Sequence, residues 1–500
     1  MDDESVAPGV WRFARASRAT VIVDAANYFD SMQKAMLKAQ QRILLIGWDF
    51  DTRIHLTEGR RWYQKGRSEQ PPIRLGSFVL WLNRHRKDLD IKILKWSYGL
   101  VKFFGRGSMA VDLLRWWPRR RIDINFDTAH PVACSHHQKI VVIDGKVAVC
   151  GGIDMTTHRW DTREHLEHDP RRKRPRGSQY GPWHDATMMV EGEIAGALQD
   201  LGKDRWVRAG GKPLSKLEPT DASVWPDGLE VMFEDVEIGI ARTRAEYKGS
   251  PQINEIADLF VRQIGQAKNL IYAESQYFAS RKIADALCKR LAEDNPPEVV
   301  IVHPQNADGW LEQQAMDHAR VELLRVLGEV DKHNRFNLFV PYTGETPIYV
   351  HAKIMIIDDE ILRIGSANMN NRSLGLDSEC DLFIDANRPG NAAAAKPIKQ
   401  MRYSLLAEHC GLEIGEVPAL LSRYGSMANM VANIGRERSR TLRRFDPPEL
   451  NAAESTVAES KLLDPETPDE MFEPFANGGL FRSRTVLTRA KNKLTKDNAK

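Results

Sequence analysis

The sequence predicts an α/β fold in which two similar α/β/α lobes, related by a pseudo-two-fold axis, form a functional site at their interface. Two observations predict it. Short apolar or β-branched runs alternate with helical patterns in both halves of the 500-residue chain, which is typical of the α/β class. One phrase of the form HxKxxxxD also occurs twice, at residues 137–144 and 351–358. Each copy is followed at the same offset by two small residues and a polar one, as Gly151-Gly152-Ile153-Asp154 and Gly365-Ser366-Ala367-Asn368.

The expected elements follow the same order in both halves. A helical pattern over residues 23–40 leads into the apolar strand Ile43-Leu44-Leu45-Ile46, and a helical pattern over residues 253–267 leads into residues 270–273. Two further strands are expected in each half, separated from one another by helical stretches. They lie at residues 91–94 and 122–126 in the first half, and at residues 299–302 and 336–340 in the second.

Breaks in this pattern divide the chain into three parts. Proline and glycine interrupt it near residues 215–235, so the two lobes are expected at residues 1–230 and 231–444. The remaining residues, 445–500, are rich in Pro, Glu, Asp, Lys and Asn and carry few apolar patterns. Such a composition favours a charged, loosely ordered tail.

Composition narrows the class of protein. With 42% hydrophobic residues the chain buries a large core, and a net charge of +3 gives no global field for nucleic acid. The five cysteines are scattered and form no CxxC pair, which argues against a disulfide framework and a zinc site. No apolar run approaches the roughly 18 residues of a membrane helix, and the acidic start does not look like a secretory signal. We expect a cytoplasmic or peripheral membrane protein, or one exported without a signal peptide.

Positive charge is nevertheless uneven along the chain. Basic clusters occur at Arg119-Arg120-Arg121, at residues 171–176 and between Arg436 and Arg444. Each cluster is compatible with a solvated loop or helix face. Each is also compatible with attraction to anionic lipid headgroups. The sequence leaves both interpretations open.

The first HxKxxxxD copy is expected to form a hairpin. Asp144-Gly145 is a strong two-residue turn signal, and alternation along the preceding strand points His137 and Lys139 to the same face. A two-residue turn places Gly152 opposite His137, with Asp154 just beyond on that face. Small and polar groups there leave room for a phosphate oxygen to approach the backbone, so Gly152 and Asp154 are predicted to bind phosphate.

The second copy repeats this arrangement. With Asp358-Asp359 at the turn, Ser366 lies opposite His351 and Asn368 just beyond, and Lys353 shares the face of His351. Ser366 and Asn368 are therefore predicted to bind phosphate as well. Each hairpin offers one imidazole and one ammonium group, which together suit phosphodiester cleavage without a metal ion. We accordingly expect no metal and no other cofactor.

The aspartates of the phrase have a different predicted role. Asp144 and Asp358 lie seven positions after their histidines, roughly 23 Å along a strand at about 3.3 Å per residue. They are expected to brace the turns as structural supports of the motif. The adjacent His136 is expected to point to the opposite face as a bystander.

At these residues the chain resembles the phospholipase D superfamily, and in particular its members with two HxKxxxxD motifs. "HHQKIVVIDGKVAVCGGID" followed by "HRWDT" and "PWHD" is similar to the first catalytic segment of eukaryotic-type phospholipases D. "IYAESQYF" resembles the block before their second motif, and "VHAKIMIIDDEILRIGSANMNNRSLGLDSE" resembles that motif itself. The Gly-Gly-x-Asp ending of the first copy departs from the general Gly-Ser-x-Asn form and resembles the eukaryotic type. The resemblance covers most of residues 40–390.

The resemblance implies a covalent mechanism at a paired-histidine site. One histidine attacks phosphorus to form a phosphohistidine, and the other protonates the leaving alcohol and then activates water. By this resemblance His137 is the nucleophile and His351 the acid and base, while Asp185 and Glu379 match the carboxylates that hold the histidines. The groups that would neutralise the equatorial oxygens are Lys139, Lys353 and Asn368.

The leading functional hypothesis is a phospholipase D that hydrolyses phosphatidylcholine or a similar lipid to phosphatidic acid and a free headgroup alcohol. The alternative is a phosphatidyltransferase of the cardiolipin-synthase type, followed by a nucleic-acid phosphodiesterase and a catalytically silent lipid-binding protein. The expected partner is a phospholipid membrane surface, no nucleic acid is expected, and a monomer holds both motifs. Four aromatic residues are compatible either with a cage for a quaternary ammonium headgroup or with core packing, namely Trp48, Trp116, Trp183 and Tyr277.

Overall fold

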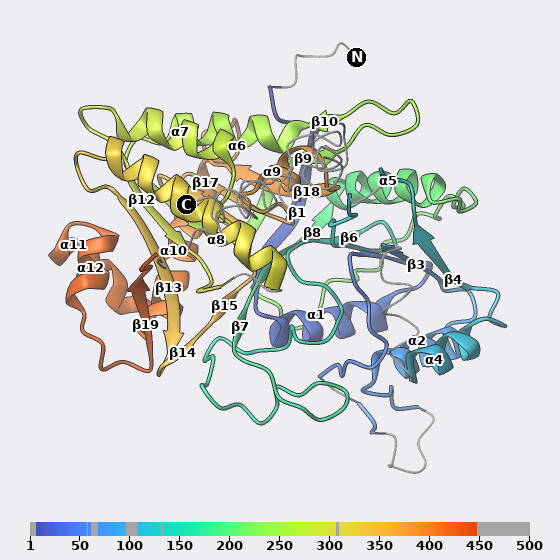
Figure 1. Ribbon diagram of the computed structural model, residues 1–500. Coiled ribbons are helices and arrows are strands. Elements are labelled where there is room, and N and C mark those ends of the chain that lie inside the picture. Colours follow the sequence, from blue (N-terminus) through green and yellow to red (C-terminus); the bar gives the residue numbers. More distant parts are fainter. Residues whose placement is uncertain are drawn as a thin grey trace, which may run out of the picture.

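The computed structural model describes residues 7–57, 59–61, 69–96, 108–131, 134–306 and 310–447, so the expected tail lies almost wholly outside the described residues. Figure 1 shows two α/β halves side by side. The first half contains β1 (Arg12–Val23), α1 (Ala25–Lys38), β2 (Arg42–Gly47), α2 (Leu75–His85), β3 (Asp90–Trp96), α4 (Ser108–Trp116), β4 (Ile122–Asp127), β5 (Ile140–Ile143), β6 (Val147–Gly151), β7 (Trp183–His184), β8 (Ala186–Gly192) and α5 (Glu193–Arg208).

The second half repeats the order of the first. It contains β9 (Phe233–Arg244), β10 (Ile253–Asn254), α6 (Glu255–Gln266), β11 (Leu270–Glu274), α7 (Arg281–Leu291), β12 (Glu298–Val302), α8 (Trp310–Val330), β13 (Phe336–Thr343), β14 (Thr346–Pro347), β15 (Tyr349–Val350), β16 (Ile354–Ile357), β17 (Ile361–Gly365), α9 (Asn371–Gly375), β18 (Glu379–Asp385), α10 (Ala395–Cys410), α11 (Val417–Tyr424), α12 (Met427–Asn433) and β19 (Arg440–Arg444). The α/β class and the strands expected from the repeat are confirmed.

Strand pairing is also repeated between the halves. In the first half β2, β3 and β4 pair in parallel, and β2 continues through the antiparallel strands β5, β6 and β8. In the second half β11, β12 and β13 pair in parallel, and β11 continues through β16, β17 and β18. The long strand β1 pairs with both β8 and β9, and β9 pairs with β18. Hydrogen bonds therefore link the two halves into one β structure.

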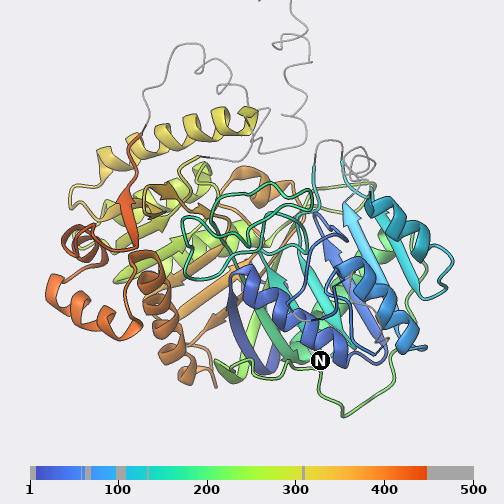
Figure 2. The ribbon, with the colours of Figure 1, turned by 90° about the horizontal axis from the view of Figure 1, so that it is seen from below.

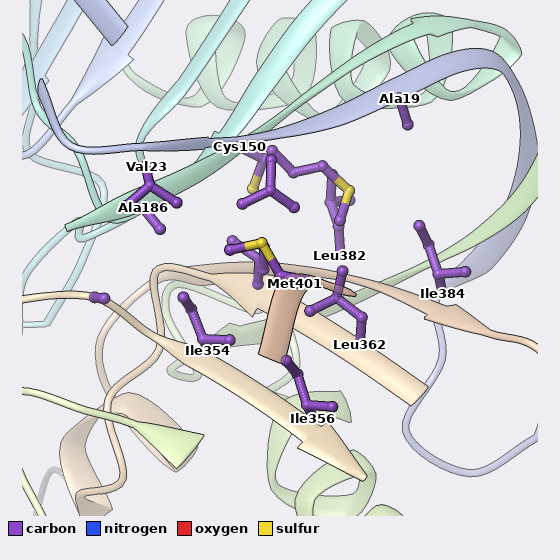
Figure 3. Packing of buried hydrophobic residues seen from close by; sticks show 14 of the residues in the cluster. Ala19, Val23, Cys150, Ala186, Ile354, Ile356, Leu362, Leu382, Ile384 and Met401 are labelled. Atoms are coloured by element: carbon purple, nitrogen blue, oxygen red, sulfur yellow. The ribbon is translucent and has the colours of Figure 1, made fainter. Parts of the chain in front are cut away.

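The central core lies between the halves. Figure 3 shows Val23 and Cys150 of the first half facing strands of the second half that carry Ile354 and Leu382, and all of the labelled side chains belong to one buried cluster. Burying one such aliphatic side chain contributes about 1.5–3 kcal/mol. Because the cluster draws on both halves, separating them would expose many of these side chains, and the interface is permanent.

Separate outer cores join the helices to the outer faces of the halves. One core packs α1 and α2 against β2 and β3, and another packs α6 and α7 against β11 and β12. Figure 2 shows α1, α2 and α4 at the outside of the first half. Within the described residues, no helix is both long and apolar enough to cross a membrane.

Candidate active site

The two motif histidines meet at the interface between the halves. The ring centroids of His137 and His351 lie 6.5 Å apart, with their planes inclined at 59°. His137 lies shortly before β5 in the chain, and His351 is the residue that follows β15. The short strand β15 pairs in parallel with β7 of the other half, and the backbone N–H of His351 donates to the carbonyl of His184 at 2.8 Å. The two imidazoles are thus close enough to act on one phosphoryl group.

Each histidine is held by a carboxylate from the opposite half. Nδ1 of His137 lies 3.1 Å from both carboxyl oxygens of Glu379, the first residue of β18. Nδ1 of His351 lies 2.7 Å from Oδ2 of Asp185, which stands between β7 and β8. Nδ1 of His137 also lies 3.0 Å from the carbonyl of Ser366, which only accepts hydrogen bonds, so Nδ1 carries the proton. Nε2 of His137 therefore has its lone pair available.

The two carboxylates differ in their surroundings. Glu379 accepts from Oγ of Ser366 at 2.5 Å and from Oγ of Ser373 at 2.8 Å, and burial raises its pKa to about 8. Asp185 accepts from the backbone N–H of Ala186 at 2.8 Å, and burial raises its pKa to about 6. At neutral pH Glu379 is mainly protonated while Asp185 is mainly ionised. Of the two carboxyl groups, only Asp185 thus carries a negative charge that favours the imidazolium form of its histidine, His351.

The two lysines lie in unequal settings. Nζ of Lys139 lies 3.2 Å from Oδ2 of Asp154 and donates to the carbonyl of His137 at 2.8 Å. Nζ of Lys353 donates to the carbonyl of His351 and lies 3.5 Å from Oε1 of Gln276. Burial lowers the pKa of Lys353 to about 7, although Asp185 opposes this shift.

Burial and neighbouring cations lower the pKa of both motif histidines. Burial, followed by the charges of Lys139 and Lys353, holds the pKa of His137 well below its usual value. The pKa of His351 is likewise held well below its usual value, by burial and by the charges of Lys353 and Arg159. The guanidinium of Arg159 stacks over the ring of Trp183 at 4.2 Å. A bound phosphodiester anion opposes the effect of these cations, because its negative charge stabilises the protonated form of a neighbouring imidazole.

The predicted hairpin register is wrong by one residue. Ile143 pairs with Val147 rather than Lys146, and Ile357 pairs with Ile361 rather than Glu360. Gly152 and Ser366 therefore do not lie opposite the histidines in the expected register. The turns themselves are the expected two-residue kind, because the N–H of Lys146 donates to the carbonyl of Ile143 at 3.0 Å and the N–H of Glu360 donates to that of Ile357 at 2.9 Å. The shift arises just after each turn, where Lys146 or Glu360 is left out of the strand pairing.

The motif aspartates bind backbone N–H groups far from the histidines. The carboxylate of Asp144 accepts from the N–H groups of Gln40, Gln41 and Arg42 at 2.7–2.8 Å. The carboxylate of Asp358 accepts from three equivalent N–H groups at 2.7–2.9 Å, those of Lys268, Asn269 and Leu270. Each aspartate thus fixes the loop that leads from a helix into the first parallel strand of its half.

The residues predicted to bind phosphate have protein partners of their own. A Cβ atom at Gly152 would collide with Oδ1 of Asp185, so this glycine makes room for the carboxylate. Asp154 accepts from the N–H of Trp48 at 3.1 Å, and Ser366 donates to Glu379. Asn368 reaches Oε1 of Gln276 at 3.5 Å, and its own Oδ1 is buried without a hydrogen bond.

The aromatic residues divide into two groups. The ring of Trp48 lies 6.4 Å from that of His137, and the ring of Trp183 lies 5.2 Å from that of His351. Trp116 instead lies in the outer core with Phe50, so core packing accounts for it.

The neighbouring His136 is buried, with Nδ1 2.5 Å from Oγ of Ser378 and Nε2 3.0 Å from Asp127.

Behind Asp185 lies a buried charged network that the sequence pattern did not reveal. His184 places Nε2 2.7 Å from Glu274 and Nδ1 2.8 Å from Glu408. His165 lies 3.0 Å from Glu408, and surrounding carboxylates raise its pKa to about 9 despite burial. Two groups in it have the composition of a metal site, namely Asp24, His165, His184 and Glu408, and His184, Glu274 and His409. Separations of 2.7–3.0 Å are hydrogen-bond lengths, so we interpret the network as ion pairs.

This network supports the site through the backbone. The N–H of Asp185 donates to Oδ1 of Asp24 at 3.1 Å, and the N–H of Asp24 donates to the carbonyl of Asp185 at 2.8 Å. Glu274 belongs to the "IYAESQYF" block and His184 to "PWHD", so these two family-resembling segments of the sequence contain part of the network.

Comparison with known proteins agrees with the resemblance seen in the sequence. The family model described as "Phospholipase D" matches residues 35–291, and the model described as "Cardiolipin synthase, PLD-like domain" matches residues 260–402. The chain is 26% identical to phospholipase D alpha 1 of Vigna unguiculata over 78% of its length, and 26% identical to that of Nicotiana tabacum over 76%. It spans 64% and 63% of the lengths of these relatives.

One solved structure shares the fold across most of the chain. The phosphatidylserine synthase of Haemophilus influenzae Rd KW20 superposes with a TM-score of 0.51 at 12% identity, covering 84% of this chain and 96% of that one. The first family model alone matches more than half of the 500 residues. Together with the paired motifs, these matches show that the chain belongs to the phospholipase D family.

Proposed function

We propose that the protein is a phospholipase D, which hydrolyses the headgroup phosphodiester of a glycerophospholipid to phosphatidic acid and a free alcohol. The observation that carries this proposal is the crossed pair of histidine–carboxylate contacts, His137 with Glu379 and His351 with Asp185, beside two lysines. Relatives named phospholipase D alpha 1 support the choice of substrate class.

The geometry favours His137 as the nucleophile. Its Nδ1 proton is held by a carbonyl and by Glu379, which is mainly neutral at pH 7, so Nε2 stays unprotonated. Nε2 forms a bond to phosphorus as the bond from phosphorus to the headgroup oxygen breaks. The phosphatidyl group is then attached to His137.

His351 is correspondingly assigned as the acid and base. The ionised Asp185 stabilises its imidazolium once the anionic substrate is bound, and its Nε2 proton passes to the leaving oxygen. In the second step the same nitrogen takes a proton from water as the oxygen of that water attacks phosphorus and the bond to His137 breaks. The ammonium groups of Lys139 and Lys353 stabilise the charged equatorial oxygens.

The second candidate function is phosphatidyl transfer to an alcohol. The match of residues 260–402 to the model described as "Cardiolipin synthase, PLD-like domain" favours it, and the same intermediate serves both reactions. The two outcomes differ only in whether water or an alcohol attacks the phosphatidyl group.

A headgroup-release assay over a panel of phospholipid vesicles tests the proposal. We expect phosphatidic acid and one equivalent of free alcohol from at least one lipid, with both products absent for His137→Ala. Added glycerol or phosphatidylglycerol separates the candidates, because a transferase forms a new diester in preference to phosphatidic acid. Absence of headgroup release from every lipid by the wild-type protein would contradict the assignment.

A further inference from the structure

One buried arginine beside the active site has no acceptor for its hydrogen bonds. Arg159 lies in the loop between β6 and β7, which Figure 1 shows below β7, and it is 9% exposed. Among the described residues its side chain forms no hydrogen bond and no ion pair, and its Nε is buried without a partner. Its guanidinium instead lies over the ring of Trp183, 4.2 Å from the ring centroid.

The other buried arginines in the described part of the chain are all paired. Each has a carboxylate or carbonyl oxygen within 3.5 Å, namely Arg42, Arg172, Arg205, Arg320, Arg363 and Arg402. A guanidinium carries five N–H donors and is always charged, and burying such a group without an acceptor is unfavourable. The fold therefore leaves Arg159 for a ligand that supplies an anionic acceptor.

The charge of Arg159 acts on one side of the histidine pair. It lowers the pKa of His351, after the larger effects of burial and of Lys353. For His137 the leading causes of the lowered pKa are burial and the two motif lysines. The ring of Trp183 also lies beside that of His351, with ring centroids 5.2 Å apart. Arg159 thus belongs to the side of the site on which His351 protonates the leaving oxygen.

The headgroup of a substrate occupies this same side. In the proposed mechanism the bond to the leaving oxygen breaks opposite the attacking Nε2 of His137, so the departing alcohol faces His351. The two motif lysines are assigned to the equatorial oxygens of the phosphate. A guanidinium on the side of the leaving group is therefore placed for a second charged group, which lies in the headgroup beyond the scissile ester.

The same arrangement argues against a quaternary ammonium headgroup at Trp183. The residue is 8% exposed, and Tyr349 stacks on its ring with centroids 4.5 Å apart and planes inclined at 21°. The guanidinium of Arg159 already makes the cation–π contact that a choline group would need. A cation at this place also repels an ammonium group. Trp183 is therefore occupied by the protein's own cation.

We propose that Arg159 is a specificity-determining residue that selects lipids whose headgroup carries a carboxylate, as that of phosphatidylserine does. The planar guanidinium matches the two oxygens of a carboxylate and forms paired hydrogen bonds to them. The inference rests on the proposed lipid function, because it assigns Arg159 a partner within the headgroup of that substrate. Phosphatidylethanolamine lacks only the carboxylate of phosphatidylserine and is the matched, disfavoured substrate.

The test compares kcat/KM for these two lipids in mixed micelles with one nonionic detergent, from the release of serine or ethanolamine. We expect the full chain to prefer phosphatidylserine by about 10–100-fold, the range of one charge-assisted pair. Arg159→Gln should lose this preference, while its kcat/KM on phosphatidylethanolamine falls by less than about 3-fold. Phosphatidylglycerol has the net charge of phosphatidylserine without its carboxylate, so it controls for the charge of the micelle and should stay well below phosphatidylserine.

Two results for Arg159→Gln would overturn the proposal. Equal losses on both lipids would place the guanidinium on the phosphate rather than on the headgroup. An unchanged ratio of the two kcat/KM values would leave Arg159 with its packing on Trp183 alone. Should circular dichroism show that this variant does not fold, Arg159→Lys decides, because it keeps the charge but loses the paired geometry. Its ratio must then fall at least about 3-fold below that of the wild type.

Arg171→Gln is the matched control. It removes a guanidinium of the same loop that also stacks on a tryptophan, Trp160 at 4.9 Å, but that is exposed and pairs with Asp169 at 2.6 Å. The ratio of the two lipids should stay within about 2-fold of the wild type, since an exposed ion pair contributes little. An equal fall of the ratio in Arg171→Gln and Arg159→Gln would show a general effect of loop charge and overturn selection by Arg159.

Binding of soluble headgroups separates this inference from the proposed function. Isothermal titration of the full chain with O-phosphoserine and O-phosphoethanolamine needs no turnover. We expect O-phosphoserine to bind at least about 10-fold more tightly, and Arg159→Gln to remove the difference. If no lipid releases its headgroup but this difference holds, the proposed function fails and recognition by Arg159 stands. If phosphatidylserine and phosphatidylethanolamine are cleaved equally well, the proposed function stands and this inference fails.

Discussion

Glu379 and His137 lie 3.1 Å apart although 242 residues separate them in the chain. The contact crosses between the halves, as does that between Asp185 and His351. Each half thus holds a histidine that is oriented only when the other half is in place. The permanent core between the halves serves this purpose directly, because a shift of either half would move a carboxylate away from its imidazole.

The two carboxylates are expected to respond differently to neutral substitution. Asp185→Asn should lower kcat about 10²–10⁴-fold, because an amide does not stabilise the imidazolium of the acid. Glu379→Gln should cost less than about 10-fold, since Glu379 is mainly protonated at pH 7 and glutamine still accepts from His137. Steady-state kinetics on one lipid checks this. Equal losses in the two variants would contradict the assigned roles.

The pH dependence of kcat/KM follows from Asp185 and Lys353. The pKa of Asp185, raised to about 6, makes activity increase as pH rises through 6, because the ionised form supports His351. The pKa of Lys353, lowered to about 7, makes activity fall as pH rises through 7, because the neutral amine no longer stabilises the charged equatorial oxygens. We expect a bell-shaped profile between these limits. Lys353→Arg, which keeps its charge, should lose the alkaline limb and keep the acidic one.

The roles of the histidines are separable with a better leaving group. In a phosphatidyl ester of 4-nitrophenol the leaving anion needs little protonation, so His351→Ala should still release a burst of about one nitrophenolate per enzyme and then stall. His137→Ala should give no burst. Rapid-mixing absorbance measures both, with the exposed His85→Ala as a control that behaves like the wild type. A burst in His137→Ala but not in His351→Ala would exchange the two assignments.

The motif aspartates should affect stability rather than chemistry. Asp144→Ala and Asp358→Ala each leave three backbone N–H groups without their acceptor, at a cost of about 2–3 kcal/mol in the free energy of unfolding. Because both aspartates lie at the far ends of the hairpins, kcat per folded molecule should stay within about 3-fold of the wild type. Denaturant unfolding and kinetics on the same preparations test this. A stable variant without activity would refute the bracing role.

The sequence predicted which strands, histidines and lysines form the site better than it predicted the contacts between them. Local periodicity and the repeated phrase were enough for the parallel strands and for the histidines and lysines, because these depend on short-range alternation. The pairing of each histidine with its carboxylate depends on how the two halves pack, and no spacing in the sequence encodes that pairing. The hairpin register was missed because one residue after each two-residue turn, Lys146 or Glu360, is left out of the strand pairing, and the turn signal does not encode that irregularity. The network around His184 draws on residues from Asp24 to His409, and separations of this size leave no pattern.

Gly152 gives the sharpest test of the site's packing. Its place in the repeat is taken by Ser366 in the second half, where a side chain fits and donates to Glu379. In the first half Asp185 fills the space that a Cβ atom at Gly152 would need. Gly152→Ala should therefore displace Asp185 and lower kcat about 10–100-fold, since small misplacements of catalytic groups have effects of this size.

The matched control is Gly196→Ala, which places the same methyl group on α5 where no atom lies within 4 Å. That variant should keep full activity and gain slightly in stability, because alanine favours the helix over glycine. The loss in Gly152→Ala should resemble that of Asp185→Asn, with little nitrophenolate burst defect and a slow reaction on lipids with alcohol headgroups. If Gly152→Ala instead slowed both substrates equally, the displaced group would be the nucleophile rather than the partner of the acid.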